Sequence, residues 1–523
     1  MRTHGDGASR SSYTAAGVRR APILAVLSAA ALCGCRGGSE PPAVFTISTP
    51  YAIGTLEPGV WNRQSDFALL SNLYEPLLVN DADLSPLPCL AERWRNPDAL
   101  TWVFDLREGV RFHDGRPLTA EDVVWSVERL RTDPRLEASV YAASIRSARA
   151  LDVRTVEIRT EAPSAILLNK LRFVMVVPKG ASPAELAERP VGTGPYRLEA
   201  YRPGAEMRFV RNEDYWGRRP DLPVVSILLN RSAKEALDDF VSKRSDFVQS
   251  DSRESEAVLR DLAGVETRRH SSVAVKFLTL DVARAKTPGV DAARNPFVDV
   301  RVRRAVSMAV DRAELVRRLE VPAVPAHQVV TPFIFGFDPA LPPTRPDPEG
   351  ARRLLAEAGW PNGFAVTLHA RALFAEAASV VAEMLGRAGI RVAVRTLTER
   401  EYFEAIEGGR ATMTLTRFGC PTGDASNMLE NALHTRQEAS HLGKNNYPGY
   451  SDAELDRLVE EADRIPEMSR RRLVLSKAIG IAMRDLPWVP LYVDETFYAF
   501  RSGISWQPRN DDFLIAADIR RAP

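Results

Sequence analysis

The chain has 523 residues, 45% of them hydrophobic, and its 69 basic and 68 acidic residues leave a formal charge of +1. Because a single hydrophobic core stops growing near roughly 250 to 300 residues, we expect more than one domain. The balanced charge gives no sign of the basic surplus that marks binders of nucleic acid or anionic membranes, so no nucleic-acid partner is expected.

The first 35 residues predict a secretory signal. Arg19 and Arg20 precede the apolar run APILAVLSAAAL, which is too short to span a membrane. The segment ends in LCGC (32–35), which resembles the bacterial lipobox. By that resemblance Cys35 is acylated and anchors the mature protein, whereas an ordinary cleaved signal would release a soluble one. Residues 36–42 are expected to form a flexible tether.

The remaining cysteines and the histidines limit the covalent and metal chemistry. Cys89 and Cys420 are the sole candidates for an internal disulfide, and the sequence leaves their pairing open. The seven histidines show no ligand spacing, so no metal site and no cofactor are expected. No later run of about 20 apolar residues predicts a membrane-spanning helix.

The stretch TWVFDLREGVRFHDGRPLTAEDVVWSVERL (101–130) holds a histidine beside an aspartate, which could be an acid-base or metal pair. Asp114 and Gly115 supply turn chemistry, and neighbours in a turn tend to point their side chains apart. Thr119 and Asp122 then form a capping box for a helix. We therefore interpret His113 and Asp114 as part of a turn.

Two series of alternating elements follow. VVSILLN (224–230), a helical stretch and DFVQS (246–250) predict one βαβ unit. FAVTLHA (364–370), a helix over 374–388, IRVAVRTL (390–397), a helix over 399–407 and ATMTLTRF (411–418) predict a βαβαβ unit. In such sheets ligands lie beyond the carboxyl ends of the strands, so the loops after 249 and 416 are candidate site loops.

Further along, SDAELDRLVEEA (451–462) predicts a helix with Ser451 and Glu454 as its capping box. Gly192, Thr193 and Gly194 in GTGPY are interpreted as residues that shape a strand entry, because adjacent glycines serve backbone geometry first. None of these signals carries chemistry.

The stretch LAERWRNPDALTWVFDLREGVRFHDGRPLTAEDVVWSVERL (90–130) closely resembles the family of bacterial extracellular solute-binding proteins that includes the oligopeptide and dipeptide binders of ABC importers. PVGTGPYRLEAYRPG, RNEDYWGRRP and DPEGARRLLAEAGWPNGF match it too. The resemblance implies an α/β fold of the type II periplasmic-binding-protein class, with two lobes, three domains and a ligand cleft between the lobes. The lobes would close over a solute and present the closed form to a membrane permease.

By the same resemblance, lobe one combines residues 43–80, 189–275 and 492–521, residues 81–188 form an attached smaller domain, and lobe two spans 276–491. The protein is expected to be a monomer in the periplasm or at the extracytoplasmic face of the membrane.

In peptide-binding relatives, lobe two carries a tryptophan and, three residues later, an aspartate that pairs with the peptide's α-ammonium. The counterpart here is RFGCPTGDASNML (417–429). An ungapped match places Phe418 and Pro421 at those positions, while one inserted residue places Asp424 at the second. The ungapped match is preferred, and it removes the ammonium anchor. Because a buried ammonium without a partner costs several kcal/mol, it predicts a solute whose headgroup is not an anchored free amine.

The predicted ligand contacts come from three places in the chain, and packing in the core is the alternative for each aromatic residue among them. They are Trp61, Gln64, Tyr141, Phe418, Gly419, Cys420 and Asp424.

Three functions were weighed. The preferred one is a lipid-anchored receptor of an ABC importer for a peptide-like solute. Because relatives in this family bind oligosaccharides, opines, haem or nickel complexes, a non-peptide solute is the alternative. A secreted hydrolase is disfavoured, since no Gly-x-Ser-x-Gly, His-Glu-x-x-His or paired zinc spacing occurs. A sensor or chaperone lipoprotein of the same fold is the third.

Overall fold

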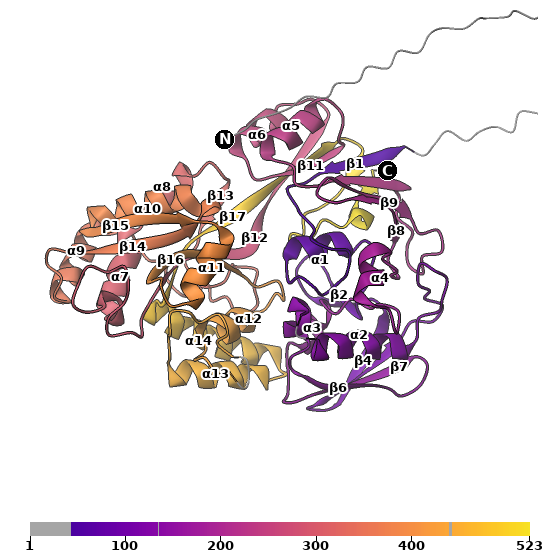
Figure 1. Ribbon diagram of the computed structural model, residues 1–523, viewed down its shortest axis with the longest axis horizontal. Coiled ribbons are helices and arrows are strands. Elements are labelled where there is room, and N and C mark those ends of the chain that lie inside the picture. The colour runs from indigo at the N-terminus through magenta and orange to yellow at the C-terminus, as the bar shows by residue number, and fades with distance from the viewer. Residues whose placement is uncertain (1–42, 134, 439–441, 523) are drawn as a thin grey trace, which may run out of the picture. The chain divides into compact units, whose positions relative to one another are not determined.

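The computed structural model describes residues 43–133, 135–438 and 442–522 (Figure 1). The chain divides into units 1–42 and 43–523, and the fold described here is that of the second unit. The predicted signal, the tether and Cys35 lie outside the described residues.

An eleven-stranded mixed sheet runs through this unit in the order β15-β14-β16-β12-β17-β11-β1-β10-β9-β8, with β13 paired to β17. Its strands are β1 (Val44–Ser48), β8 (Tyr196–Arg202), β9 (Glu206–Arg211), β10 (Val224–Leu228), β11 (Phe247–Ser250), β12 (Val265–Leu280), β13 (Ala323–Pro325), β14 (Phe364–Arg371), β15 (Ile390–Leu397), β16 (Met413–Gly419) and β17 (Trp488–Arg501).

A second sheet has the order β4-β5-β7-β6, and two strand pairs stand apart from it. The four strands are β4 (Ala91–Asp98), β5 (Thr101–Leu106), β6 (Ile145–Ala150) and β7 (Thr155–Thr160). The pairs are β2 (Leu78–Asn80) with β3 (Pro86–Pro88), and β18 (Ile504–Ser505) with β19 (Arg520–Arg521).

The α-helices of the described residues lie between and beyond these strands. They are α1 (Gln64–Leu70), α2 (Ala120–Thr132), α3 (Leu167–Leu171), α4 (Pro183–Glu188), α5 (Ala233–Val241), α6 (Arg253–Arg260), α7 (Val300–Ala309), α8 (Arg312–Arg318), α9 (Pro348–Glu357), α10 (Ala375–Arg387), α11 (Glu399–Glu407), α12 (Ser426–Met428), α13 (Ala453–Asp463) and α14 (Met468–Asp485). None of them is both long and apolar enough to cross a bilayer.

Both predicted α/β series are present. β10 and β11 flank β1 and run parallel to it, with α5 as the connection between them. β14 pairs in parallel with β15 and with β16, and α10 and α11 are the crossovers. Gly389 has φ +96° at the end of α10, in the left-handed region that glycine adopts without a steric penalty.

Three large hydrophobic cores fill the unit. The first packs β1, α1 and the second sheet together with residues 513–519 near the C-terminus. The second lies between β14, β16, α7 and α10. The third packs α13 and α14 against β12 and residues 326–334.

β12 and β17 connect the parts of the sheet that these cores cover. The two strands pair antiparallel from Val265 to Thr279, and the register shifts between Ser271 and Val275. Beyond the shift β12 pairs with β16, while β17 pairs with β11 at its other end. The Lys276 ammonium, 1% exposed, forms an ion pair with Asp494 beside the shift.

The GTG segment acts through its backbone, in line with its interpretation. A Cβ on Gly192 would come within 2.0 Å of the Leu73 carbonyl oxygen, and one on Gly194 within 2.7 Å of it. His113 Nε2 lies 3.1 Å from the Gly194 carbonyl oxygen, and Asp114 pairs with Arg116. The turn interpretation of His113 and Asp114 is confirmed.

The two cysteines beyond the signal are both buried and free. Cys89 Sγ lies 3.8 Å from Glu75 Oε1 in the first core, whereas Cys420 belongs to the third core. The open question of a disulfide between them is therefore answered in the negative.

One helix cap differs from the prediction. Asp452, not Ser451, caps α13, and its carboxylate accepts from the backbone amides of Glu454 and Leu455 at 2.9 and 2.8 Å. Ser451 instead accepts a hydrogen bond from the Thr435 hydroxyl. Two adjacent residues that can both cap a helix are not separated by sequence pattern alone.

Candidate functional site

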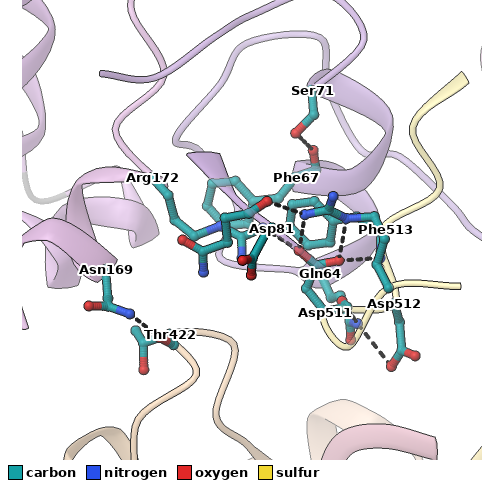
Figure 2. Close-up of polar contacts among 12 residues, drawn as sticks. Gln64, Phe67, Ser71, Asp81, Asn169, Arg172, Thr422, Asp511, Asp512 and Phe513 are labelled. Atoms are coloured by element: carbon teal, nitrogen blue, oxygen red, sulfur yellow. Dashed lines mark hydrogen bonds and ion pairs between the residues drawn. The ribbon is translucent and has the colours of Figure 1, made fainter. Parts of the chain in front are cut away.

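A cluster of polar side chains surrounds two consecutive aspartates near the C-terminus (Figure 2). Gln64, the first residue of α1, donates from Nε2 to the Asp511 carbonyl oxygen at 2.6 Å and to Asp512 Oδ2 at 3.2 Å. Asp511 is fully buried and accepts from Arg172 at 2.9 Å and from Arg509 at 2.8 Å. Burial opposes its charge, but the two guanidinium groups outweigh burial and lower the pKa of Asp511.

Asp512 has no such compensation. It is 5% exposed, and its Oδ1 has no hydrogen-bond partner among the described residues. Burial raises the pKa of Asp512 to about 7, against the smaller opposing effects of Ser272, Gln64 and Lys276. Its backbone has φ +57°, and its carbonyl oxygen accepts from the Tyr51 hydroxyl at 2.6 Å.

A pocket of about 350 Å³ opens beside the register shift of β12 and β17. We call it the His270 pocket. It is lined by Arg269, His270, Ser271, Val324, Pro325, Ala326, His327, Val330, Thr331, Pro332, Phe333, Phe337, Val493 and Glu495. His270 also faces Asn510 and Asp511, whose interactions oppose the lowering of its pKa by burial. The pocket therefore lies close to the aspartate cluster.

Three contacts join α3 and its preceding loop to residues 422–463. Asn169 Nδ2 donates to the Thr422 carbonyl oxygen at 2.8 Å (Figure 2). Lys170 Nζ lies 3.4 Å from Glu430 Oε2, and the Ala165 amide donates to the Asp463 carbonyl oxygen at 2.8 Å. These contacts connect a segment of the first hydrophobic core with segments of the third.

Burial and neighbouring charges shift the pKa values of Lys170, Glu430 and Asp463 at that junction. Burial opposes the charge of Lys170, but Glu430 and Asp463 outweigh it, so the pKa of Lys170 is raised. The pKa values of Glu430 and Asp463 are raised by burial, which Lys170 opposes. The buried Lys170 ammonium thus stabilises the charged forms of two buried carboxyl groups.

Of the predicted contacts, only Gln64 lies in the aspartate cluster. Trp61 is half-buried in the preceding loop, with the Arg63 guanidinium 4.2 Å from its ring centroid. Tyr141 is 3% exposed and stacks on Phe173 with ring centroids 4.1 Å apart. Its hydroxyl donates to Asn62 Oδ1 at 2.9 Å, so its surroundings in this structure are those of a core residue.

The predicted contacts after residue 416 line the third core. Phe418 packs edge-on against Trp488 at 6.1 Å, Gly419 pairs with Ala274, and Cys420 is 2% exposed. Asp424 is 4% exposed and forms a buried ion pair with Arg471.

Both carboxylate oxygens of Asp424 are occupied within the protein. Oδ1 accepts from Arg471 Nη2 at 3.0 Å and from the Ser426 amide at 2.9 Å, and Oδ2 accepts from Arg471 Nη1. The guanidinium that neutralises Asp424 comes from α14, so this carboxylate is paired within the protein, while its role as a ligand contact stays a prediction. The choice between Pro421 and Asp424 at the anchor position stays a prediction.

Several residues of the site were not predicted: Asp511, Asp512, Arg172, His270, His327 and Thr331. The doublet of aspartates in RNDDF (509–513) was the one available signal for the cluster. Nothing in the local pattern distinguishes the two histidines from surface histidines. No group of three or more His, Cys, Asp or Glu side chains that could hold a metal ion occurs in the described part of the chain.

Comparisons with known proteins show the family and the fold. Residues 85–440 match the family model described as bacterial extracellular solute-binding proteins, family 5 middle. The chain is 25% identical to heme-binding protein A of Haemophilus influenzae over 86% of this chain and 84% of that one. It is 24% identical to the glutathione-binding protein GsiB of Escherichia coli K12 over 93% and 96%.

Solved structures show the same fold. The periplasmic binding protein DppA of Helicobacter pylori, in complex with the peptide STSA, superposes with a TM-score of 0.77 at 21% identity. The match covers 92% of this chain and 98% of that one. The mixed α/β fold is thus that of the type II periplasmic binding proteins, as predicted.

Asp512 generates a prediction for the pH dependence of stability. Because burial holds the folded pKa of Asp512 at about 7, above its ordinary value of 3.8, folding is penalised increasingly as pH rises from about 4 to 7. Asp512→Asn should therefore raise the free energy of unfolding at pH 8, by at most roughly 4 kcal/mol at about 1.4 kcal/mol per pKa unit, and should leave it unchanged near pH 4.

Urea unfolding at the two pH values measures this difference. Asp511→Asn is the matched control: it removes the partner of two buried guanidinium groups and should destabilise by about 3 to 5 kcal/mol at pH 8. Equal effects of Asp512→Asn at both pH values would contradict the assignment.

Proposed function

Since the chain belongs to the family of bacterial extracellular solute-binding proteins, family 5, we propose that it is the solute-binding component of an ABC importer. It captures a peptide or peptide-like solute between two lobes and delivers it to the permease in the membrane. Its family binds and transports solutes, and we propose no catalytic role for it.

The proposed lobes follow the predicted boundaries: 43–80, 189–275 and 492–521 in lobe one with 81–188 attached, and 276–491 in lobe two. The hydrophobic cores support this division. Residues of the first core fall within lobe one and its attached domain, and those of the second fall almost entirely within lobe two.

The observation that carries the proposal is the position of the His270 pocket beside β12 and β17, the strands that would join the two proposed lobes. β12 and β17 pass from one lobe to the other, and their ladder is interrupted between Ser271 and Val275. A break in a ladder bends more easily than a continuous one, and the pocket opens beside it. A solute bound there contacts both lobes and favours the arrangement in which its contacts are best.

The contacts of α3 with residues 422–463 support a closed form. Lys170, Asn169 and the Ala165 amide all come from the domain attached to lobe one, and their partners belong to lobe two. They would form when the lobes approach and be lost when the lobes separate.

If the contacts of Lys170 stabilise the closed form, a variant without its ammonium group should bind solute more weakly. Lys170→Met leaves Glu430 and Asp463 buried without their cation, which opening of the lobes would relieve. A solute found by a thermal-shift screen of peptides, sugars, opines and metal chelates should bind at least about tenfold more weakly to this variant.

Small-angle scattering checks the cause. Wild-type protein should become more compact with saturating solute, and Lys170→Met should compact less. Lys179→Met, which removes an exposed pair with Glu121, is the control and should behave as wild type. Identical scattering with and without bound solute would exclude the proposed closure.

The solute class follows from the loop after β16. Pro421 has no charge, and Asp424 is already paired with Arg471, so this loop offers no free carboxylate to an ammonium group. We infer a solute that is not held there by a free amine. The same observation favours the second candidate, a non-peptide solute such as an oligosaccharide, an opine or a metal complex.

Calorimetry with tripeptides tests this inference. The affinities of a free tripeptide and its N-acetyl derivative should agree within about threefold, because no free carboxylate in this loop forms an ion pair with the ammonium group. An affinity loss of a hundredfold or more on acetylation would refute it.

We also propose that Cys35 is acylated and anchors the protein at the extracytoplasmic face of the membrane, on the basis of its LCGC segment. In cells of a bacterial host, radiolabelled palmitate should enter the wild-type protein and not Cys35→Ser, and the variant should leave the membrane fraction. Cys33→Ser is the control. Equal labelling of all three proteins would exclude Cys35 as the acylated residue.

A further inference from the structure

The His270 pocket has walls that are mainly apolar. Its apolar lining residues are Val324, Pro325, Ala326, Val330, Pro332, Phe333, Phe337 and Val493. The ring of His270 lies at 29° to that of Phe333, with centroids 6.0 Å apart. An engineered cavity of about 150 Å³ accepts benzene, so about 350 Å³ gives room for a group of roughly two rings.

Three polar atoms in this lining are buried without a hydrogen-bond partner among the described residues. They are His270 Nε2, His327 Nδ1 and Thr331 Oγ1. Thr331 is only 2% exposed. Buried polar groups nearly always have a partner, and a bound molecule can supply the one that the protein does not.

The pocket carries no uncompensated charge. Burial lowers the pKa of His270 and of His327, so both imidazoles are neutral at pH 7. The Arg269 guanidinium is shared between Glu256, at 2.5 Å, and Glu495, at 3.1 Å. A charged group entering this pocket would therefore lose its hydration without gaining an ion pair.

These properties exclude two kinds of occupant. A purely aliphatic group would fill the volume but leave the three polar atoms without partners, which costs free energy. A cation or anion would find Arg269 and Glu495 already paired within the protein. A flat ring meets the apolar walls with its faces and can place donors or acceptors at its edge.

From this we infer that the His270 pocket is a specificity subsite that binds an uncharged aromatic or heteroaromatic group of the solute, with its polar edge at His270, His327 and Thr331. The inference rests on the proposed function, because it names the part of the solute that this site would recognise.

Ligand-observed NMR tests it with small probes rather than with the natural solute. The probes are benzamide, its saturated counterpart cyclohexanecarboxamide, toluene without a polar edge, and the cation benzylamine. Benzamide should bind saturably and at least about threefold more tightly than each of the other three.

The variant Thr331→Val keeps the shape of the side chain and removes the hydroxyl. It should weaken benzamide about three- to tenfold, the effect of one lost hydrogen bond, while toluene binds as well as before or better. Retained binding of toluene shows that the variant is folded. Thr101→Val is the control, since Thr101 is 5% exposed with an equally unpartnered hydroxyl but lies in β5, outside the pocket.

Equal binding of benzamide and cyclohexanecarboxamide, tighter binding of benzylamine, no binding of any probe, or no effect of Thr331→Val would each overturn the inference. The thermal-shift screen and scattering distinguish that failure from failure of the proposed function. If a solute still compacts the protein, the proposed function stands. If no solute of any class stabilises the protein, both the inference and the proposed function are excluded.

Discussion

The pairing of β12 with β17 is the constraint on which the structure depends. Through these two strands the parallel unit around β14 and the strands around β1 belong to one hydrogen-bonded sheet. A regular ladder of this length would join them rigidly. The register shift between Ser271 and Val275 interrupts it, and the buried ion pair of Lys276 with Asp494 stands next to the interruption. The joint between the proposed lobes is thus continuous in the chain, and its ladder is irregular at two places, between Ser271 and Val275 and between Lys276 and Phe277.

Many buried polar groups of the scaffold have hydrogen-bond or ion-pair partners within the protein, whereas some of those in the site have none among the described residues. Glu75 is buried, yet it accepts from Tyr215, Trp216 and Thr193 at 2.7 to 2.8 Å. Asp424 is held by Arg471 in the same manner. Such paired groups fix the packing of distant segments. Asp512 and the polar atoms of the His270 pocket lack this compensation, and they lie on either side of the joint.

The sequence predicted most of what depends on local pattern. The βαβαβ unit from β14 to β16 follows from periodicity, and the capping box of Thr119 with Asp122 follows from spacing. The cap of α13 was assigned one residue too early, because Ser451 and Asp452 can both accept from the same amides. Errors of this kind arise where two neighbouring residues satisfy one rule.

The site was less predictable, because it is assembled from residues far apart in the chain. Gln64 was found through its place in a loop of the resembling family, but its partner Asp512 is 448 positions away. The His270 pocket likewise needs β12, β17 and residues 324–337 to meet. Phe418, near the end of β16, and Cys420, directly after it, were predicted as ligand contacts, and in the structure both pack with the third core. The orientation of a side chain at a strand end depends on packing that periodicity does not contain.

Under the proposed function, the binding of a small group in the pocket would be converted into a movement of the proposed lobes. His270 precedes the register shift and belongs to proposed lobe one, whereas His327, Thr331 and Phe333 belong to proposed lobe two. A ring that satisfies polar atoms on both sides can do so at one lobe angle only. A ligand shifts a conformational equilibrium only by its difference in affinity for the two states. Hydrogen-bonding groups divided between the proposed lobes would create such a difference.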